Sequence, residues 1–477
     1  MYSASWGRDN ERCHKVFSSQ VHPDGLPAPR RYWAIATIVL AITMSVLDSN
    51  IANVALPTLA REFHVSAAAS IWVINAYQIA ILVMLLPLAA LGEIVGYRRV
   101  SQTGLLVFTL ASLGCALAPS LFALTLARVV QGCGAAGIMS VNAALVRFTY
   151  PQRLLGRAVG INAFAVATAA ALGPTVASGV LAIATWRWLF AINLPIGVVT
   201  LAIALRALPE SERAARRLSA ASTALHAGTF ILLGSGLEAL AHDAATPLAI
   251  VQLIGGSLLA GALAHHELRE ASPLVPFDLL RIRLFSLSLA TSVCAFAAQM
   301  TALVALPFEI QRLGHSAVAT GLLMTPWALA VAVAAPIAGR LADRYPAGLL
   351  GGIGLALLAT GLTALVLFPH AGGAGDFAWR MILCGLGFGL FQSPNNRTLI
   401  LAAPRARAGA AGGMLATARL SGQTLGAAGV AILFRSNPST GSNAALAAAA
   451  VLAGVAALVS VSRLSLGTPA RRVGDSP

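Results

Sequence analysis

Long apolar runs recur along almost the whole chain, and they constrain its fold more than any other feature. A run of roughly 18 residues or more, rising about 1.5 Å per residue as a helix, can cross a hydrocarbon core of roughly 30 Å. A transmembrane barrel needs short segments of alternating polarity instead. With 57% hydrophobic and 10% charged residues among 477, the chain carries too little charge to cover a water-soluble globule. The sequence therefore predicts an all-α integral membrane protein.

We predict fourteen transmembrane spans, at residues 33–56, 71–91, 100–117, 121–146, 158–183, 188–207, 222–239, 247–264, 284–308, 320–338, 349–368, 377–391, 409–434 and 444–461. Basic residues test this number, because cytoplasmic loops carry an excess of Lys and Arg. The chain has 32 Lys and Arg residues. The predicted outer side receives only Arg61, Arg187, Arg312 and Arg435, and the spans themselves contain Arg128, Arg380 and Arg419. All the others fall on the opposite side. We therefore expect an inner (cytoplasmic) membrane protein with both termini in the cytoplasm, and we attribute the net charge of +15 to topology and not to nucleic-acid binding.

The chain contains an internal repeat. The segment Ala89–Arg99, "ALGEIVGYRR" with a preceding Ala, is echoed by "GRLADRYPAG" when Glu93 is aligned with Asp343, an offset of 250 residues. Chance similarity between short Gly/Arg loops is the alternative, but the two segments occupy matching places in the predicted topology. We predict two pseudo-symmetric six-helix halves, 32–207 and 284–463, with an inserted helix pair within 208–283 and tails at 1–31 and 464–477. Repeats of this kind place the substrate cavity of a transporter between the halves.

Four segments resemble motifs of the fourteen-span drug/proton antiporter branch of the major facilitator superfamily, the multidrug efflux type. They are "LDSNIANVALPTLAREF", "ALGEIVGYRR", "LTLARVVQGCGAAG" and "ALGPTVASG", in order along the chain. The second departs from the family pattern at Ala89, Glu93 and Ile94, and the fourth has Ala177 and Ser178 in place of paired glycines. The resemblance implies a proton antiporter that works by alternating access.

Asp48 is the one acidic residue deep inside a predicted span, and ionisable groups in hydrocarbon are functional candidates. It lies about 22 Å along the first span and Arg128 about 10 Å along the fourth, which runs the other way, so we expect similar heights. In the fold that the resemblance implies, the pair can meet across the central cavity. Burial favours the neutral carboxyl form of Asp48, and a nearby guanidinium favours the charged carboxylate. Asp48 can therefore take up and release a proton beside Arg128. A static ion pair is the alternative.

Further polar residues inside spans are candidates for the substrate cavity, although plain hydrogen bonds between helices are the alternative. They are Asn50, Asn53, Asn75, Gln78, Asn142, Gln299 and Arg419. Arg419, about 15 Å into the thirteenth span, lacks an obvious acidic partner in the sequence. It is either a substrate or coupling residue or an arginine that faces water in the cavity.

The resemblance also implies residues that control the conformational change. These gating candidates are Glu93, Gly96, Arg98, Arg99, Gly132, Gly173, Pro174, Asp343 and Arg344. The glycines and the proline allow close approach and bending, for which ordinary packing is an equivalent explanation. The two acids can latch one conformation through a helix-dipole contact, and solvated loop ends are the alternative.

The sequence thus predicts a proton-coupled exporter of amphipathic organic compounds such as drugs or lipophilic cations. The alternatives are export or proton-coupled import of an endogenous metabolite and, from another class, a membrane sensor that transports nothing. We expect no enzymatic activity, since neither a nucleotide-binding GxxxxGK[ST] motif nor a catalytic residue set is readable. The expected partners are protons, a small-molecule substrate and the lipid bilayer. We expect no cofactor, metal or nucleic acid, and a monomer is compatible with the sequence.

Overall fold

A computed structural model describes residues 25–151, 154–211, 219–240, 246–270, 273–342, 344–367, 373–403, 408–436 and 440–466. Within these ranges the regular structure consists of helices, and no strand occurs among them. The prediction of an all-α protein is confirmed for the part of the chain that is described. In the membrane-spanning part this composition follows from lipid, which offers no partner for backbone N–H and C=O groups, so each segment must satisfy its own.

The helices follow one another with short connections. They are α2 (Ala28–Glu62), α3 (Ala67–Val95), α4 (Tyr97–Ala116), α5 (Leu121–Thr149), α6 (Leu155–Ile183), α7 (Arg187–Ala191), α8 (Asn193–Ala207), α9 (Ala220–Ala239), α10 (Thr246–Glu267), η3 (Phe277–Arg281), α11 (Arg283–Arg312), α12 (Ala317–Leu341), α13 (Ala347–Leu367), α14 (Gly373–Ala402), α15 (Ala408–Ser436), α16 (Gly441–Ser462) and η5 (Arg463–Leu466). Every predicted span overlaps a helix. The sixth span overlaps two helices and not one, because α7 ends and α8 begins on either side of Ile192.

Ten helical segments among the described residues are long and apolar enough to cross a membrane. Length and composition therefore leave the predicted number of fourteen spans undecided. The packing places α9 beside the core of the protein: it contacts α3 and α15, and α10 packs against α9. His226 Nε2 lies 3.2 Å from the Leu82 carbonyl oxygen, and near the other end of α9 the Arg435 guanidinium donates to the Leu240 carbonyl.

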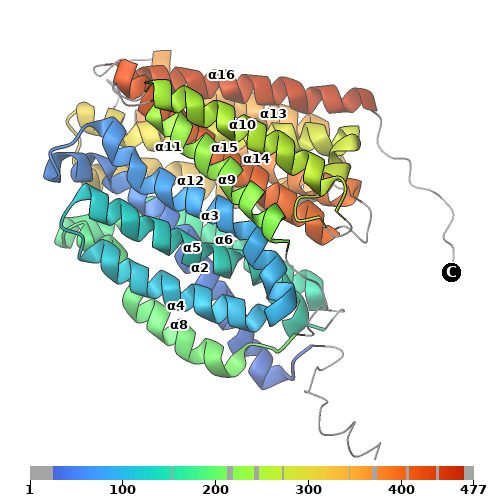
Figure 1. The fold of residues 1–477 in the computed structure, drawn as a ribbon. Helices are drawn as coiled ribbons and strands as arrows, with labels where there is room; N and C mark the ends of the chain where they lie inside the picture. Colours follow the sequence, from blue (N-terminus) through green and yellow to red (C-terminus); the bar gives the residue numbers. More distant parts are fainter. Residues whose placement is uncertain are drawn as a thin grey trace, which may run out of the picture.

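Helices α2 to α8, blue to green, lie on one side of the bundle, and α11 to α16, yellow to red, lie on the other (Figure 1). The packing partners recur between the two groups. The contacts α3–α5, α4–α5, α2–α6, α2–α8 and α4–α8 reappear as α12–α14, α13–α14, α11–α15, α11–α16 and α13–α16.

Glycine contacts repeat as well. A Cβ on Gly132 would lie 2.6 Å from the Tyr77 carbonyl oxygen and 2.8 Å from Ala80 Cβ. A Cβ on Gly385 would lie 2.2 Å from the Trp327 carbonyl oxygen and 2.7 Å from Ala330 Cβ. These separations are too short for any side chain, so each glycine sets how closely two helices approach.

The ends of the helices repeat in the same way. The hydroxyl of Ser66 caps α3 by accepting a hydrogen bond from the Ala69 N–H at 3.1 Å. In the same way, the hydroxyl of Ser316 caps α12 by accepting from the Ala319 N–H at 3.2 Å. At this end of the bundle, which is the predicted outer end, the Arg61 guanidinium donates to Gln311 Oε1 at 3.1 Å. This hydrogen bond between α2 and α11 therefore joins the two groups of helices at that end.

Candidate transport site

Asp48 and Arg128 form a buried ion pair between α2 and α5. Asp48 is 2% exposed and Arg128 fully buried, and Arg128 Nη1 donates to Asp48 Oδ2. The other carboxylate oxygen, Oδ1, accepts from Gln131 Nε2 at 3.0 Å and from Asn193 Nδ2 at 2.8 Å. The predicted contact is thus present, and each carboxylate oxygen has at least one donor. A buried carboxylate requires such donors, because removing it from water costs several kcal/mol.

The guanidinium of Arg128 is held by further contacts. Its Nε donates to the Val73 carbonyl at 3.0 Å and its Nη1 to Gln131 Oε1 at 2.7 Å. The guanidinium carbon lies 3.9 Å from the centre of the Tyr77 ring, which gives a cation–π contact. Tyr77 in turn donates its hydroxyl to the Ser45 carbonyl on α2 at 3.1 Å. Tyr77 therefore links Arg128 to α2.

The sequence led us to expect that the pair meets across the central cavity. In the structure it does not. Asp48 projects from α2 toward α5 and α8, and neither Asp48 nor Arg128 lines the cavity described below. The cavity is lined by other positions on α2, including Ser45, Ser49 and Asn53. For Ser49 the reason is helical geometry, since it is one position from Asp48 and adjacent residues of a helix point in directions about 100° apart.

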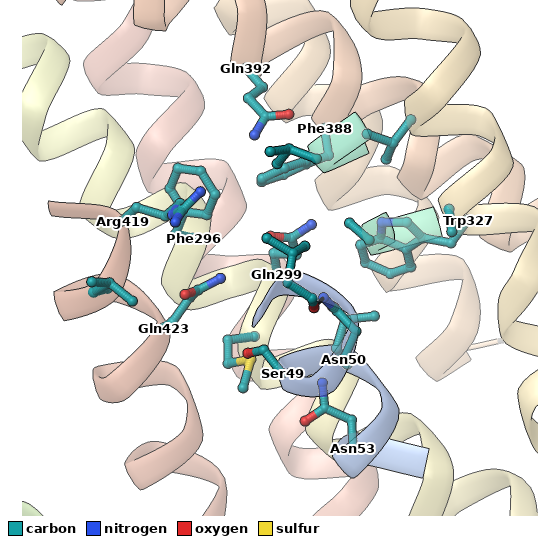
Figure 2. Close-up of a pocket in the computed structure, with 18 of the residues that line it drawn as sticks. Ser49, Asn50, Asn53, Phe296, Gln299, Trp327, Phe388, Gln392, Arg419 and Gln423 are labelled. Carbon is teal, nitrogen blue, oxygen red and sulfur yellow. Dashed lines mark hydrogen bonds between the residues drawn. The ribbon is translucent and has the colours of Figure 1, made fainter. Parts of the chain in front are cut away.

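A cavity of about 360 Å³ lies between the two groups of helices, within the usual size range of small-molecule sites. Figure 2 shows amide, aromatic and arginine side chains around it. The predicted residues among its lining are Asn50, Asn53, Gln299 and Arg419. The lining residues that the sequence analysis missed include Ser49, Tyr77, Phe296, Trp327, Phe388, Gln392, Asn396 and Gln423. Gln423 carried a usable signal, because it lies one helical turn from Arg419 on the same face of α15.

Many lining residues fall in pairs with the spacing of the sequence repeat. Pairs 250 residues apart are Val46 with Phe296, Ser49 with Gln299, Asn50 with Met300, Asn53 with Leu303, Tyr77 with Trp327 and Ile81 with Val331. A spacing three residues longer relates Met139 to Gln392, Val166 to Arg419 and Ala170 to Gln423. Equivalent faces of equivalent helices therefore surround the cavity, but with different side chains.

Three of the predicted cavity residues do not line this cavity. Asn75 and Gln78 are buried on α3, and Gln78 Nε2 lies 3.8 Å from Met300 Sδ on α11. Asn142 is half-buried on α5. For Gln78 the alternative reading, a contact between helices, is the one the structure shows. The polarity of these residues was readable from the sequence, but the rotation of their helices was not.

Among the gating candidates at the α3–α4 connection, Arg98 contacts the end of α8, in its own group of helices. Arg98 Nη1 pairs with Glu210 Oε1 at 3.3 Å, and Arg98 also donates to the Leu205 carbonyl at the end of α8. Arg99 is exposed, Glu93 is half-buried, and Gly96 has φ = +101°, a conformation that favours glycine. The described contacts thus fasten this connection to α8.

The remaining gating candidates are on α5, α6 and the α12–α13 connection. Gly132 lies at the α3–α5 contact already given, and a Cβ on Gly173 would lie 2.6 Å from Asn50 Cβ. Pro174 lines the cavity, and its carbonyl oxygen would lie 2.4 Å from a Cβ on Gly321 of α12. Arg344 is exposed, and Asp343 lies outside the described residues.

Asn193 and Gln131 are polar partners of Asp48 that were not singled out. Gln131 stands in the quoted "LTLARVVQGCGAAG" segment, three residues after Arg128 and so on the same face of α5. Asn193 is the first residue of α8, directly after the break at Ile192. An amide within an otherwise apolar span was the available signal for Asn193.

Comparison with known proteins decides the family. Residues 38–427 match the family model for the Major Facilitator Superfamily. The chain belongs to this superfamily. It is 53% identical over 449 residues to the Uncharacterized transporter YebQ of Escherichia coli strain K12, which covers 94% of this chain and 98% of YebQ. It is 32% identical over 393 residues to Multidrug resistance protein Stp of Mycobacterium tuberculosis, covering 81% of this chain and 73% of Stp.

Solved structures share the major facilitator fold at low sequence identity. A bacterial homolog of the human lysosomal transporter Spinster, in an inward-facing and unoccupied conformation, matches with a TM-score of 0.67 and 17% identity. The match covers 93% of this chain and 100% of that chain. The chain is therefore a multi-pass membrane protein of a transporter superfamily, which is what the sequence analysis expected in place of an enzyme.

Proposed function

We propose that the protein is a proton-coupled exporter of amphipathic organic compounds, in the fourteen-span drug/proton antiporter branch, with both termini in the cytoplasm. The observation that carries this proposal is the Asp48–Arg128 pair, buried one residue away from Ser49, which lines the cavity. Buried ionisable groups within a membrane protein mark ion and proton paths. Two relatives carry names that agree with the proposal, the Multidrug resistance protein Stp of Mycobacterium tuberculosis and, at 26% identity, the Multidrug efflux pump LfrA of Mycolicibacterium smegmatis.

Proton coupling can operate through the Asp48 contacts. When Oδ2 takes a proton, Oδ1 keeps its amide donors from Gln131 and Asn193, and Arg128 loses its ionic partner. The released charge of Arg128 acts on Tyr77, whose ring it contacts and which lines the cavity. Protonation and the shape of the cavity are thereby linked through Tyr77.

Alternating access between two halves is supported by the repeated helix contacts and the paired lining residues. The span number is supported by α9, whose contacts with Leu82 of α3 and with Arg435 of α15 run along the bundle. Export or import of an endogenous metabolite is the alternative, and it shares the cavity and the ion pair. The direction of coupling separates import from export, and the compound that triggers the response separates a metabolite from a drug.

The test uses everted membrane vesicles with an acidic lumen and a fluorescent pH probe. For an antiporter, compounds added outside trigger loss of the proton gradient, whereas a symporter responds only to compounds loaded inside the vesicle. We expect the antiport response in wild type and its loss in Asp48→Asn. If Asp48→Asn responds like wild type, the coupling acid is not Asp48 and the proposed mechanism is wrong.

Glu309→Gln is a matched control. Glu309 is another buried acid of a long helix and is 1% exposed, and it pairs with Arg312 at 2.6 Å and with the Ser442 hydroxyl. It lies at the predicted outer end of α11 and does not line the cavity. We expect Glu309→Gln to retain the substrate-triggered response. Equal loss in both variants would trace the effect to the removal of any buried carboxylate.

A further inference from the structure

The charges around the cavity are opposite to those expected for a carrier of lipophilic cations. Arg419 is the one charged side chain among the described lining residues, and no acidic side chain is among them. Asp48, the acid that the sequence analysis assigned to proton coupling, is buried behind α2 in its pair with Arg128. In a site with a low dielectric constant, a cationic substrate would be repelled by Arg419 without a compensating anion.

Arg419 has unused hydrogen-bonding capacity. Its Nε is buried without a hydrogen-bond partner, and no ion pair to Arg419 is present in the described part of the chain. A guanidinium presents several N–H donors in a planar fork that matches a carboxylate or phosphate. An unpaired charge in a membrane protein is costly, so a substrate anion would satisfy both the charge and the donors.

The rest of the cavity suits a flat aromatic body. Phe296 and Phe388 pack edge to face with ring centres 5.3 Å apart, and Trp327 lies on the other side of the view from Arg419 (Figure 2). The indole N–H of Trp327 is buried without a partner. Gln299 and Gln423 supply amide donors and acceptors beside these surfaces. Aromatic walls with a few fixed polar groups select planar ligands that carry acceptor atoms.

The repeat shows that the charge is confined to one wall of the cavity. Arg419 and Gln423 of α15 occupy the positions that Val166 and Ala170 occupy on α6, and all four side chains line the cavity. We infer that the substrate is a planar aromatic compound with an anionic group, and that Arg419 binds this group. This inference rests on the proposed exporter function. Arg419 is then the residue that sets the charge specificity of transport.

Two dyes with the same three-ring body test this inference on the purified full-length protein in detergent. Fluorescein carries a carboxylate, and rhodamine 123 is an ester that carries a positive charge. Binding is measured by fluorescence anisotropy without a proton gradient. We expect wild type to bind fluorescein at least about tenfold more tightly than rhodamine 123, since a charge-assisted hydrogen bond contributes about 1.5–3 kcal/mol, and 1.4 kcal/mol corresponds to a factor of ten.

Variants at one position separate charge from structure. We expect Arg419→Gln to weaken fluorescein binding about tenfold or more, Arg419→Lys to weaken it less, and Arg419→Glu to reverse the preference between the dyes. Arg435→Gln, which removes an arginine of the same helix outside the cavity lining, is the matched control and leaves both affinities unchanged. Stronger or equal binding of rhodamine 123 by wild type, or unchanged fluorescein binding by Arg419→Gln, overturns the inference.

The failure of this inference and the failure of the proposed function give different results. Asp48→Asn is expected to bind fluorescein like wild type while losing proton exchange in vesicles. Fluorescein binding that depends on Arg419, without proton exchange in wild type, retains the anion site and rejects the antiporter. Proton exchange triggered only by cations retains the antiporter and rejects the anion site.

Discussion

Asp48 owes its place in the membrane to donors from two helices. Arg128 and Gln131 reach it from α5, and Asn193 reaches it from the start of α8. The charges of Asp48 and Arg128 cancel, and the amides cover the remaining lone pairs. Losing one partner of a buried pair is more damaging than losing both, because one charge is then left in a low dielectric without compensation.

This asymmetry gives a prediction for Arg128. Arg128→Met leaves the Asp48 carboxylate without its ionic partner and is expected to lower the free energy of unfolding by about 3–5 kcal/mol. In the double variant with Asp48→Asn, both charges are gone and the loss is expected to be smaller than in Arg128→Met alone. Thermal unfolding of the detergent-purified proteins measures the difference. A double variant less stable than Arg128→Met would show that the pair is not the source of the effect.

At the scale of the helices, the chain repeats a contact that only glycine permits. Gly132 brings α5 onto α3 at Tyr77, and Gly385 brings α14 onto α12 at Trp327. Both aromatic residues line the cavity. The position of each helix was predictable from the length and apolarity of its span. The division of the sixth span at Ile192 also has a sequence signal, since Pro195 has no backbone N–H to bond the carbonyl of Ala191, four residues before it.

Glycine substitutions test the close approach. Gly132→Ala and Gly385→Ala each place a methyl group less than 3 Å from backbone of the neighbouring helix, so each is expected to destabilise by about 1–3 kcal/mol. Gly429→Ala on α15 meets nothing within 4 Å and is expected to change stability by less than about 0.5 kcal/mol or to increase it. The thermal unfolding midpoints of the three variants, compared with wild type, test this expectation. A loss in Gly429→Ala equal to the other two would point to backbone flexibility and not to packing.

At the scale of the whole molecule, the two groups of helices meet at one end through polar contacts. Thr175 of α6 and Thr325 of α12 share a hydrogen bond of 2.7 Å, and Arg61 bonds Gln311. Alternating access requires contacts of this kind to break and re-form during each cycle. The proposal therefore places a gate at the predicted outer end of the cavity.

A cysteine pair tests this gate. In a protein whose native cysteines are replaced by alanine, Thr175→Cys with Thr325→Cys is expected to form a disulfide under oxidation, because the two side chains already touch. Transport in vesicles is expected to stop and to return on reduction. Leu172→Cys with Leu322→Cys, exposed positions on the same two helices, provides the control and stays active. Full transport by the cross-linked protein would show that the halves need not separate here.

The sequence by itself determined which segments are helical, because lipid forces each spanning segment to satisfy its own backbone. It also pointed to Asp48 and Arg128, since a charge in an apolar run is conspicuous wherever the helix turns. The tertiary structure decided what each polar residue faces. Asp48 contacts α5 and α8 while Ser49 lines the cavity, and Arg419 joins aromatic residues from α11, α12 and α14. Such groupings depend on the rotation and packing of helices distant in the chain, which the hydrophobicity of a single span does not encode.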